Sequence, residues 1–150
     1  MCASELQLEG QHHIGQSRIL TLSRMRAFSG GAFSEDDWPH ASTHTEISLA
    51  KASGLEAPIA AGTQIEAYLV AMLVDYAGES WFKRGSLDVR FVKGSFEGDT
   101  ITPHMEVERG QVDEGTGWVT WNVWCENQHG EKVAVGSAVC TGAQSSEALA

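Results

Sequence analysis

Acidic and histidine side chains gather in one short segment, residues 34–63, which reads SEDDWPHASTHTEISLAKASGLEAPIAAGT. A histidine and a carboxylate on an anchored loop are the usual means of moving protons near neutral pH. The segment therefore predicts acid–base chemistry, and a polar surface loop whose histidines cap the next helix is the simpler alternative. The side chains that could act are Asp36, Asp37, His40, His44 and Glu46.

A helix that begins directly after this segment adds a second chemical element. Gly62 and Thr63 open an apolar helix, and backbone N–H groups at such a start lack partners within the helix. They can polarise a carbonyl group or stabilise an oxyanion. Acid–base groups beside such a helix start predict chemistry next to a carbonyl group.

Metal binding is a weaker interpretation of the same residues. His40 and His44 are four residues apart, a spacing that places two ligands together on a helix. The stretch between them shows no helical pattern and offers no strong third ligand. We therefore expect no metal.

The central helix is predicted over residues 63–78, with Gly78 as its stop. It is apolar nearly all round, so we expect it to be heavily buried. A shorter helix is predicted over 45–54, with Thr45 as N-cap and Gly54 as its end. Residues 18–23 read as a strand and 29–39 as a loop. The apolar positions at helical spacing in the central helix are Ile65, Leu69, Met72, Leu73 and Tyr76.

The second half of the chain changes to the two-residue period of strands, over 87–93, 100–110, 117–128 and 131–142. A turn at His129–Gly130 makes the last two strands a hairpin. One face of the third strand carries Val119, Trp121, Val123 and Cys125, and the other carries Trp118, Thr120, Asn122 and Trp124. In the last strand the small residues Ala134, Gly136, Ala138 and Cys140 share a face that would let another element approach closely.

These elements predict an α+β fold in which an antiparallel sheet curls around the central helix. The 150 residues make one domain, 1–150, with loose ends at about 1–12 and 143–150. A single curled layer leaves a sheet face or edge uncovered, so we expect self-association.

Composition limits the partners and the compartment. The formal charge of −10 argues against nucleic acid and anionic membranes. The longest apolar stretch, 67–74, is too short to span a bilayer, and the N-terminus has no secretory pattern. Cys2, Cys125 and Cys140 form no metal-ligand spacing and, being odd in number, no disulfide framework. A cytoplasmic location is expected.

Three blocks of the sequence resemble the MaoC-like, or R-specific enoyl-CoA hydratase, branch of the hot-dog fold. That pattern runs D-x-N-P-x-H-x-D, a short helix, then P-x-x-H-G. His44-Thr45-Glu46 stands where the family has H-x-D, and the spacing to Gly62 needs no gap. FVKGSFEGDT at 91–100 is similar to F-x-x-P-V-x-x-G-D-T, and LTLSRMRAFSG at 20–30 looks like the strand and helix before the catalytic loop. The likeness covers most of residues 14–142.

The resemblance implies a hot-dog homodimer that reversibly hydrates an enoyl thioester of CoA or of an acyl carrier protein, without a cofactor. His44 would be the family histidine, Gly62 the glycine whose N–H binds the thioester oxygen, and Thr63 its neighbour in the substrate site. The family histidine before that glycine is Ala61 here, and Ala41-Ser42 replaces Asn-Pro.

The catalytic aspartate of the family pattern is replaced by Pro39 at the ungapped position. A loop insertion of two residues would bring Asp37 into that role, and one of three would bring Asp36. We rank Asp37 first, so His44 and Asp37 are the predicted catalytic pair.

Two other functions stay open: a hot-dog thioesterase that uses Glu66 or Asp37, and a non-catalytic acyl-binding or dimerisation module, which Pro39 favours. Glu66 could instead pair with a buried arginine. The densest basic cluster could contact a phosphate of CoA or of a carrier protein, although scattered surface charge is commoner. It comprises Lys83, Arg84, Arg90 and Lys93, and His12-His13 is interpreted as a solvated tail pair.

Overall fold

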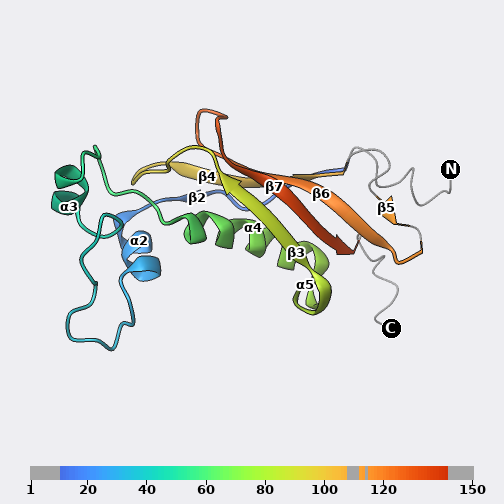
Figure 1. The fold of residues 1–150 in the computed structure, drawn as a ribbon, viewed down its shortest axis with the longest axis horizontal. Coiled ribbons are helices and arrows are strands. Elements are labelled where there is room, and N and C mark those ends of the chain that lie inside the picture. Colours follow the sequence, from blue (N-terminus) through green and yellow to red (C-terminus); the bar gives the residue numbers. More distant parts are fainter. Residues whose placement is uncertain (1–10, 108–111, 114, 142–150) are drawn as a thin grey trace.

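The computed structural model describes residues 11–107, 112–113 and 115–141. Its helices are α2 (Leu22–Ser29), α3 (Ile47–Ala52), α4 (Gly62–Ala77) and α5 (Glu79–Arg84). Its strands are β1 (His12–Ile14), β2 (Arg18–Ile19), β3 (Ser86–Phe91), β4 (Thr100–Glu106), β5 (Val112–Asp113), β6 (Trp118–Glu126) and β7 (Lys132–Thr141). In Figure 1, α4 runs along one face of the sheet, and α2 and α3 lie beyond its N-terminal end.

The sheet is antiparallel throughout, with the strand order β1-β4-β6-β7-β3; β2 also pairs with β4, and β5 with β6. The predicted hairpin is confirmed, because β6 and β7 pair along their length and Gly130 takes a positive φ of 72° in the turn. Of the two faces that the alternation predicts for β6, the structure buries the one that carries Val119, Trp121, Val123 and Cys125. The α+β class is therefore confirmed.

The central helix forms within one residue of its predicted bounds. Gly78 ends it with φ 58°, a conformation that glycine adopts without steric cost. The side chains that face the sheet are buried, whereas those on the opposite side, including Val70 and Val74, are only half-buried in the single chain. The expectation of burial nearly all round thus holds for one face of the helix.

Two predictions about where helices begin need correction. Residues 18–23 are not one strand: β2 ends at Ile19, and α2 begins at Leu22 because the Thr21 hydroxyl caps the Arg24 N–H at 3.2 Å. The N-cap of α3 is Glu46 rather than Thr45, whose hydroxyl is used inside the preceding loop. Helix α5 was not predicted.

The prediction of a solvated His12-His13 tail pair is wrong. Both residues belong to β1, which pairs with β4. His12 Nε2 lies 3.0 Å from His104 Nδ1, and His13 packs edge-on against Tyr76. Burial lowers the pKa of His13 and of His104. The predicted loose ends fall outside the described residues, except that 11 and 12 are ordered by this pairing.

The small-residue face of β7 permits the close approach that the sequence predicted. A Cβ at Gly136 would overlap the backbone carbonyl of Asp88 on β3, and Ala134, Ala138 and Cys140 are buried against the core. Cys125 and Cys140 are free thiols, and burial raises their pKa values to about 12 and about 11. Cys2 lies outside the described residues. Among those residues, none of the helices has the length and apolar character needed to cross a bilayer.

Candidate active site

His44 is held in one tautomer at the end of its loop. Its Nδ1 lies 2.7 Å from the Ile59 carbonyl oxygen, so this nitrogen carries the proton and donates. Its own backbone N–H donates to Ser42 Oγ at 3.1 Å. In the neutral form of this half-buried ring, Nε2 carries no proton and can accept one.

The loop before His44 is fixed by the buried Thr45 hydroxyl. This hydroxyl accepts the Ser42 N–H at 2.9 Å and donates to the His40 carbonyl at 2.7 Å. The Thr45 carbonyl in turn accepts Arg26 Nε at 3.0 Å, and the same guanidinium pairs with Glu46 at 3.3 Å. Helix α2 and the loop thus hold each other, which gives His44 a rigid base.

Hydrogen bonds also join this loop to the start of α4. The Ile59 N–H donates to the Thr43 carbonyl at 3.1 Å, beside the bond from His44 to Ile59. Three residues later α4 begins, and its N-cap has no capping side chain. Among the described residues, the N–H groups of Gly62 and Thr63 have no acceptor. An imidazole nitrogen and two free N–H donors are thereby anchored on one short segment.

A third segment, from the end of β3 to residue 97, supports the helix start from the other side. The Ala60 N–H donates to the Ser95 carbonyl at 2.8 Å, and the Phe91 ring lies against the Gly62 α-carbon, where a Cβ would come within 2.8 Å. Ser95 is buried, and its hydroxyl has no partner among the described residues. Phe91 and Ser95 were not predicted as site residues, although both lie in the 91–100 block.

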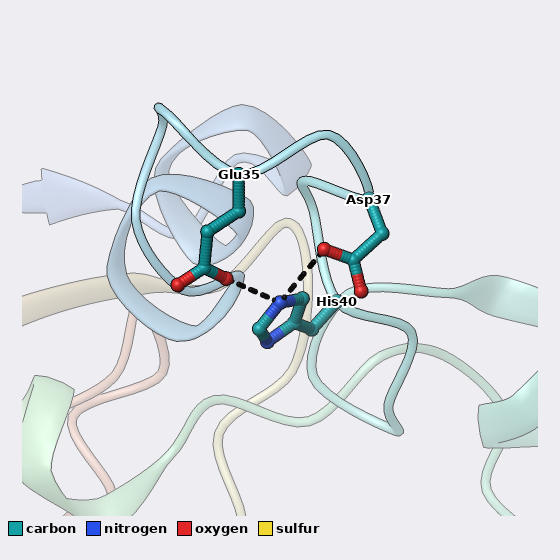
Figure 2. Close-up of side chains that lie close together, drawn as sticks. All are labelled: Glu35, Asp37 and His40. Carbon is teal, nitrogen blue, oxygen red and sulfur yellow. Dashed lines mark hydrogen bonds and ion pairs between the residues drawn. The ribbon is translucent and has the colours of Figure 1, made fainter.

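Asp37 lies in a different cluster on the same loop. Figure 2 shows the carboxylates of Glu35 and Asp37 both turned toward His40 Nε2, with Asp37 Oδ1 at 3.2 Å. The Asp37 side chain is 78% exposed. Within the described residues its contacts include none with His44, so the structure does not bring the predicted pair together.

The same three side chains, Glu35, Asp37 and His40, are the group whose ligand atoms could hold a metal ion, since these atoms lie within 4.8 Å of one another. All three are exposed, and His40 pairs with both carboxylates, as a surface ion pair would. His44, the second histidine of the considered metal pair, is bonded to a carbonyl instead.

Other sequence candidates are separated by the fold. Glu66 is half-buried on α4, and no arginine of the described part of the chain lies within ion-pair distance of it. The basic cluster divides in two: Lys83 and Arg84 are on α5, whereas Arg90 is on β3 and Lys93 pairs with Glu131 at 2.6 Å.

No family model and no curated protein matches the chain. Solved structures do. An R-hydratase, PhaJ1, from Pseudomonas aeruginosa has a TM-score of 0.74 at 19% identity, over 94% of this chain and 86% of that one. An (R)-hydratase from A. caviae has a TM-score of 0.70 at 23% identity, over 89% of this chain and 96% of that one. A MaoC-like dehydratase from Rhodospirillum rubrum has a TM-score of 0.67 at 17% identity, over 91% of this chain and 94% of that one. The chain therefore has the predicted hot-dog fold.

Proposed function

We propose that the protein is a hydro-lyase that adds water to, or removes it from, an enoyl or 3-hydroxyacyl thioester. The observation that carries this proposal is the hydrogen-bonded connection between His44 and the open start of α4. It joins the segment that carries a proton acceptor to the segment that carries unpartnered N–H donors, and chemistry beside a thioester carbonyl needs both kinds of group. The fold shared with hydratases and dehydratases supports the same class.

The reaction can be written with the groups of this site. His44 Nε2 takes a proton from water while the oxygen bonds to the β-carbon of the enoyl thioester. Electrons move onto the thioester oxygen, where the N–H of Gly62, with Thr63 beside it, stabilises the enolate charge. The carbonyl re-forms as the α-carbon receives the proton that His44 took from water, either directly from His44 or relayed through a second carrier, and His44 is neutral again. Dehydration is the reverse.

Asp37 is the proposed second proton carrier, which would orient water or deliver the proton to the α-carbon. Its contact with His40 in this structure means that the loop must release it to reach the thioester. Because Asp37 and His44 make no contact among the described residues, replacing each one separately tests its role independently.

The test follows the absorbance of the conjugated thioester in crotonyl-CoA. His44→Gln should lower kcat by roughly 10²–10⁴, the usual contribution of a positioned acid or base. His129→Gln is the matched control, the same change at an exposed turn residue whose contacts include neither His44 nor Asp37, and should leave kcat within a few fold. Asp37→Asn should act like the His44 variant, and full activity there would leave His44 as the single proton carrier. Equal activity in the parent and in His44→Gln would refute the proposal.

The same assay distinguishes the other two functions. A thioesterase would release free thiol from crotonyl-CoA with no loss of the double bond, and Glu66→Gln would abolish that release. A binding module would change neither signal. The hydratase is favoured, because His44 is hydrogen-bonded to Ile59, three residues before Gly62, whereas Glu66 makes no side-chain hydrogen bond or ion pair with the described residues.

We also propose that two chains associate through β3. One side of this strand pairs with β7, and in the described structure its other side is an open edge. Phe91 and Val92 at its end are 49% and 56% exposed. A second strand would satisfy the edge and cover these side chains. Light scattering should give twice 16.2 kDa at micromolar concentration, and a stable monomer would refute this assembly. The substrate carrier, CoA or acyl carrier protein, and a cytoplasmic location are parts of the same proposal.

A further inference from the structure

A second candidate site lies at the opposite end of α4, between α5 and the turn before β6. Here a surface cavity of about 230 Å³ is lined by five residues. Each of them carries a hydrogen-bond donor, and none carries a carboxylate. They are Ser80, Lys83, Arg84, Thr116 and Trp118.

The turn side of the cavity is held by local hydrogen bonds. The Asp113 carboxylate accepts the N–H groups of Gly115 at 2.9 Å and Thr116 at 3.3 Å. Gly117 closes the turn with a bond to the Asp113 carbonyl at 2.8 Å and a φ of 71°. Trp118 then begins β6 and packs partly against the core. The Thr116 hydroxyl and the indole are thus set on one edge of the cavity.

The helix side supplies the two cations. Trp81 packs against the core and anchors α5, so that Lys83 and Arg84 stay at the surface of this short helix. Lys83 is paired with Glu79 at 2.9 Å, which uses one of its three donors. In the part of the chain that the structure describes, the Arg84 guanidinium has no acceptor.

The chemistry of the lining selects a phosphorylated ligand. A chain of net charge −10 repels anions in general, so two adjacent cations with no carboxylate in the cavity wall are a local exception. The guanidinium fork of Arg84 matches phosphate oxygens in a bidentate way, and Lys83 adds a point charge. The Ser80 and Thr116 hydroxyls are additional donors, and the Trp118 ring offers a face for a base.

The volume of the cavity indicates which part of a phosphorylated ligand it can hold. Pockets that enclose a whole small molecule measure roughly 300–1,000 Å³, so about 230 Å³ suits the phosphate groups with the remainder of the ligand at the rim. Stacking of a base on an aromatic ring needs only one exposed face.

We propose that this cavity binds the diphosphate of a nucleotide, with the phosphates on Lys83 and Arg84 and the base against Trp118. The site goes beyond the proposed reaction and does not depend on it, because the ligand needs no thioester. Free nucleotide and the nucleotide portion of CoA share the chemistry, and they are separated by experiment.

The test is calorimetric titration of the full chain with ADP, pyrophosphate and CoA. The double variant Lys83→Gln/Arg84→Gln should weaken ADP binding at least tenfold, as the loss of charge-assisted hydrogen bonds predicts. The control Arg24→Gln/Lys51→Gln removes the same two charges at exposed positions away from the cavity and from β3, and should leave the Kd within about twofold. All these side chains are at or near the surface, and circular dichroism verifies that the variants fold.

The base and the source of the ligand are tested separately. Trp118→Leu should weaken ADP and leave pyrophosphate unchanged. CoA that binds more tightly than ADP at this cavity identifies a CoA site, and equal affinities identify a general nucleotide site. The proposal is overturned if ADP shows no saturable binding, or if both double variants weaken it equally. The proposal is also overturned if ADP does not bind and the double variant Lys83→Gln/Arg84→Gln loses affinity only for an acidic carrier protein.

Discussion

The N–H of Gly62 can be removed without breaking the helix, which makes it the sharpest point at which to test the proposed mechanism. Gly62 is the first residue of α4, where proline is tolerated because that N–H has no helical acceptor. The preceding Ala61 has φ −63° and ψ 140°, the extended conformation that a residue before proline prefers. Gly62→Pro should therefore fold, with this donor removed and a side chain added.

The added side chain needs its own control, because Gly62 packs closely on Phe91. Any Cβ at position 62 would come within 2.8 Å of the Phe91 ring. Gly62→Ala introduces the same Cβ and keeps the N–H, so the ratio of the Ala to the Pro variant isolates the donor. Phe91 is 49% exposed, so its ring has room to move.

The expected size follows from the number of free donors. Loss of one preorganised oxyanion donor lowers kcat by about 10²–10³, or about 2.7–4 kcal/mol of transition-state stabilisation. Thr63 N–H remains, so we expect about 10² in kcat between the Ala and Pro variants, with a small change in KM. The assay is hydration of crotonyl-CoA, with urea denaturation to show equal stability.

Two results would refute the reasoning. If Gly62→Pro and Gly62→Ala have the same kcat, the N–H takes no part in the reaction, and any shared loss belongs to the contact with Phe91. If the Pro variant raises KM alone, the donor binds substrate and transition state equally and does not accelerate the chemical step.

Three further predictions concern stability. Burial holds the pKa of His104 below 6.5, so the unfolded chain takes up a proton first as the pH falls. The contribution of His104 to the free energy of unfolding should be constant above about pH 6.5 and should decrease as the pH falls below that value. In urea titrations, His104→Gln should make the free energy of unfolding less dependent on pH in this range. Gly136→Ala should cost about 1–3 kcal/mol or more through its overlap with Asp88, whereas Ser137→Ala should stay within about 0.5 kcal/mol in thermal denaturation. Thr45→Val should cost about 1–2 kcal/mol in the same measurement, because two partly buried backbone groups lose their partner; an unchanged melting temperature would contradict this.

Short-range patterns were enough to predict the framework. The 3.6-residue spacing from Ile65 to Tyr76 and the glycine at 78 set the bounds of α4, because helix formation and termination depend on neighbours within a few residues. The two-residue alternation in β6 likewise separated its two faces, and the structure shows which of them is buried. The family resemblance, through the ungapped spacing from His44 to Gly62, also assigned these residues to one site, which stays a prediction; hydrogen bonds join the His44 loop to Ile59, just before α4.

The tertiary structure decided everything that depends on partners distant in the chain. His12 and His13 read as a polar tail, yet they form β1 because β4, about ninety residues away, supplies the pairing. Sequence proximity grouped Lys83, Arg84, Arg90 and Lys93, but the fold puts the first two on α5 and the others at β3 and beyond.

The position of the Asp37 carboxylate also depended on the tertiary structure. The family resemblance, with a loop insertion of two residues, named Asp37 as the partner of His44, whereas in the structure Asp37 pairs with His40 beside Glu35. Loop residues have no periodicity that fixes their direction, so the choice of partner is made by the path of the backbone. That path is held here by the Thr45 hydroxyl and by α2, through contacts that no short pattern encodes. The sequence alone determined which residue types are available to the site, and packing between distant segments determined which of them meet, because side-chain contacts require a fixed three-dimensional path of the chain.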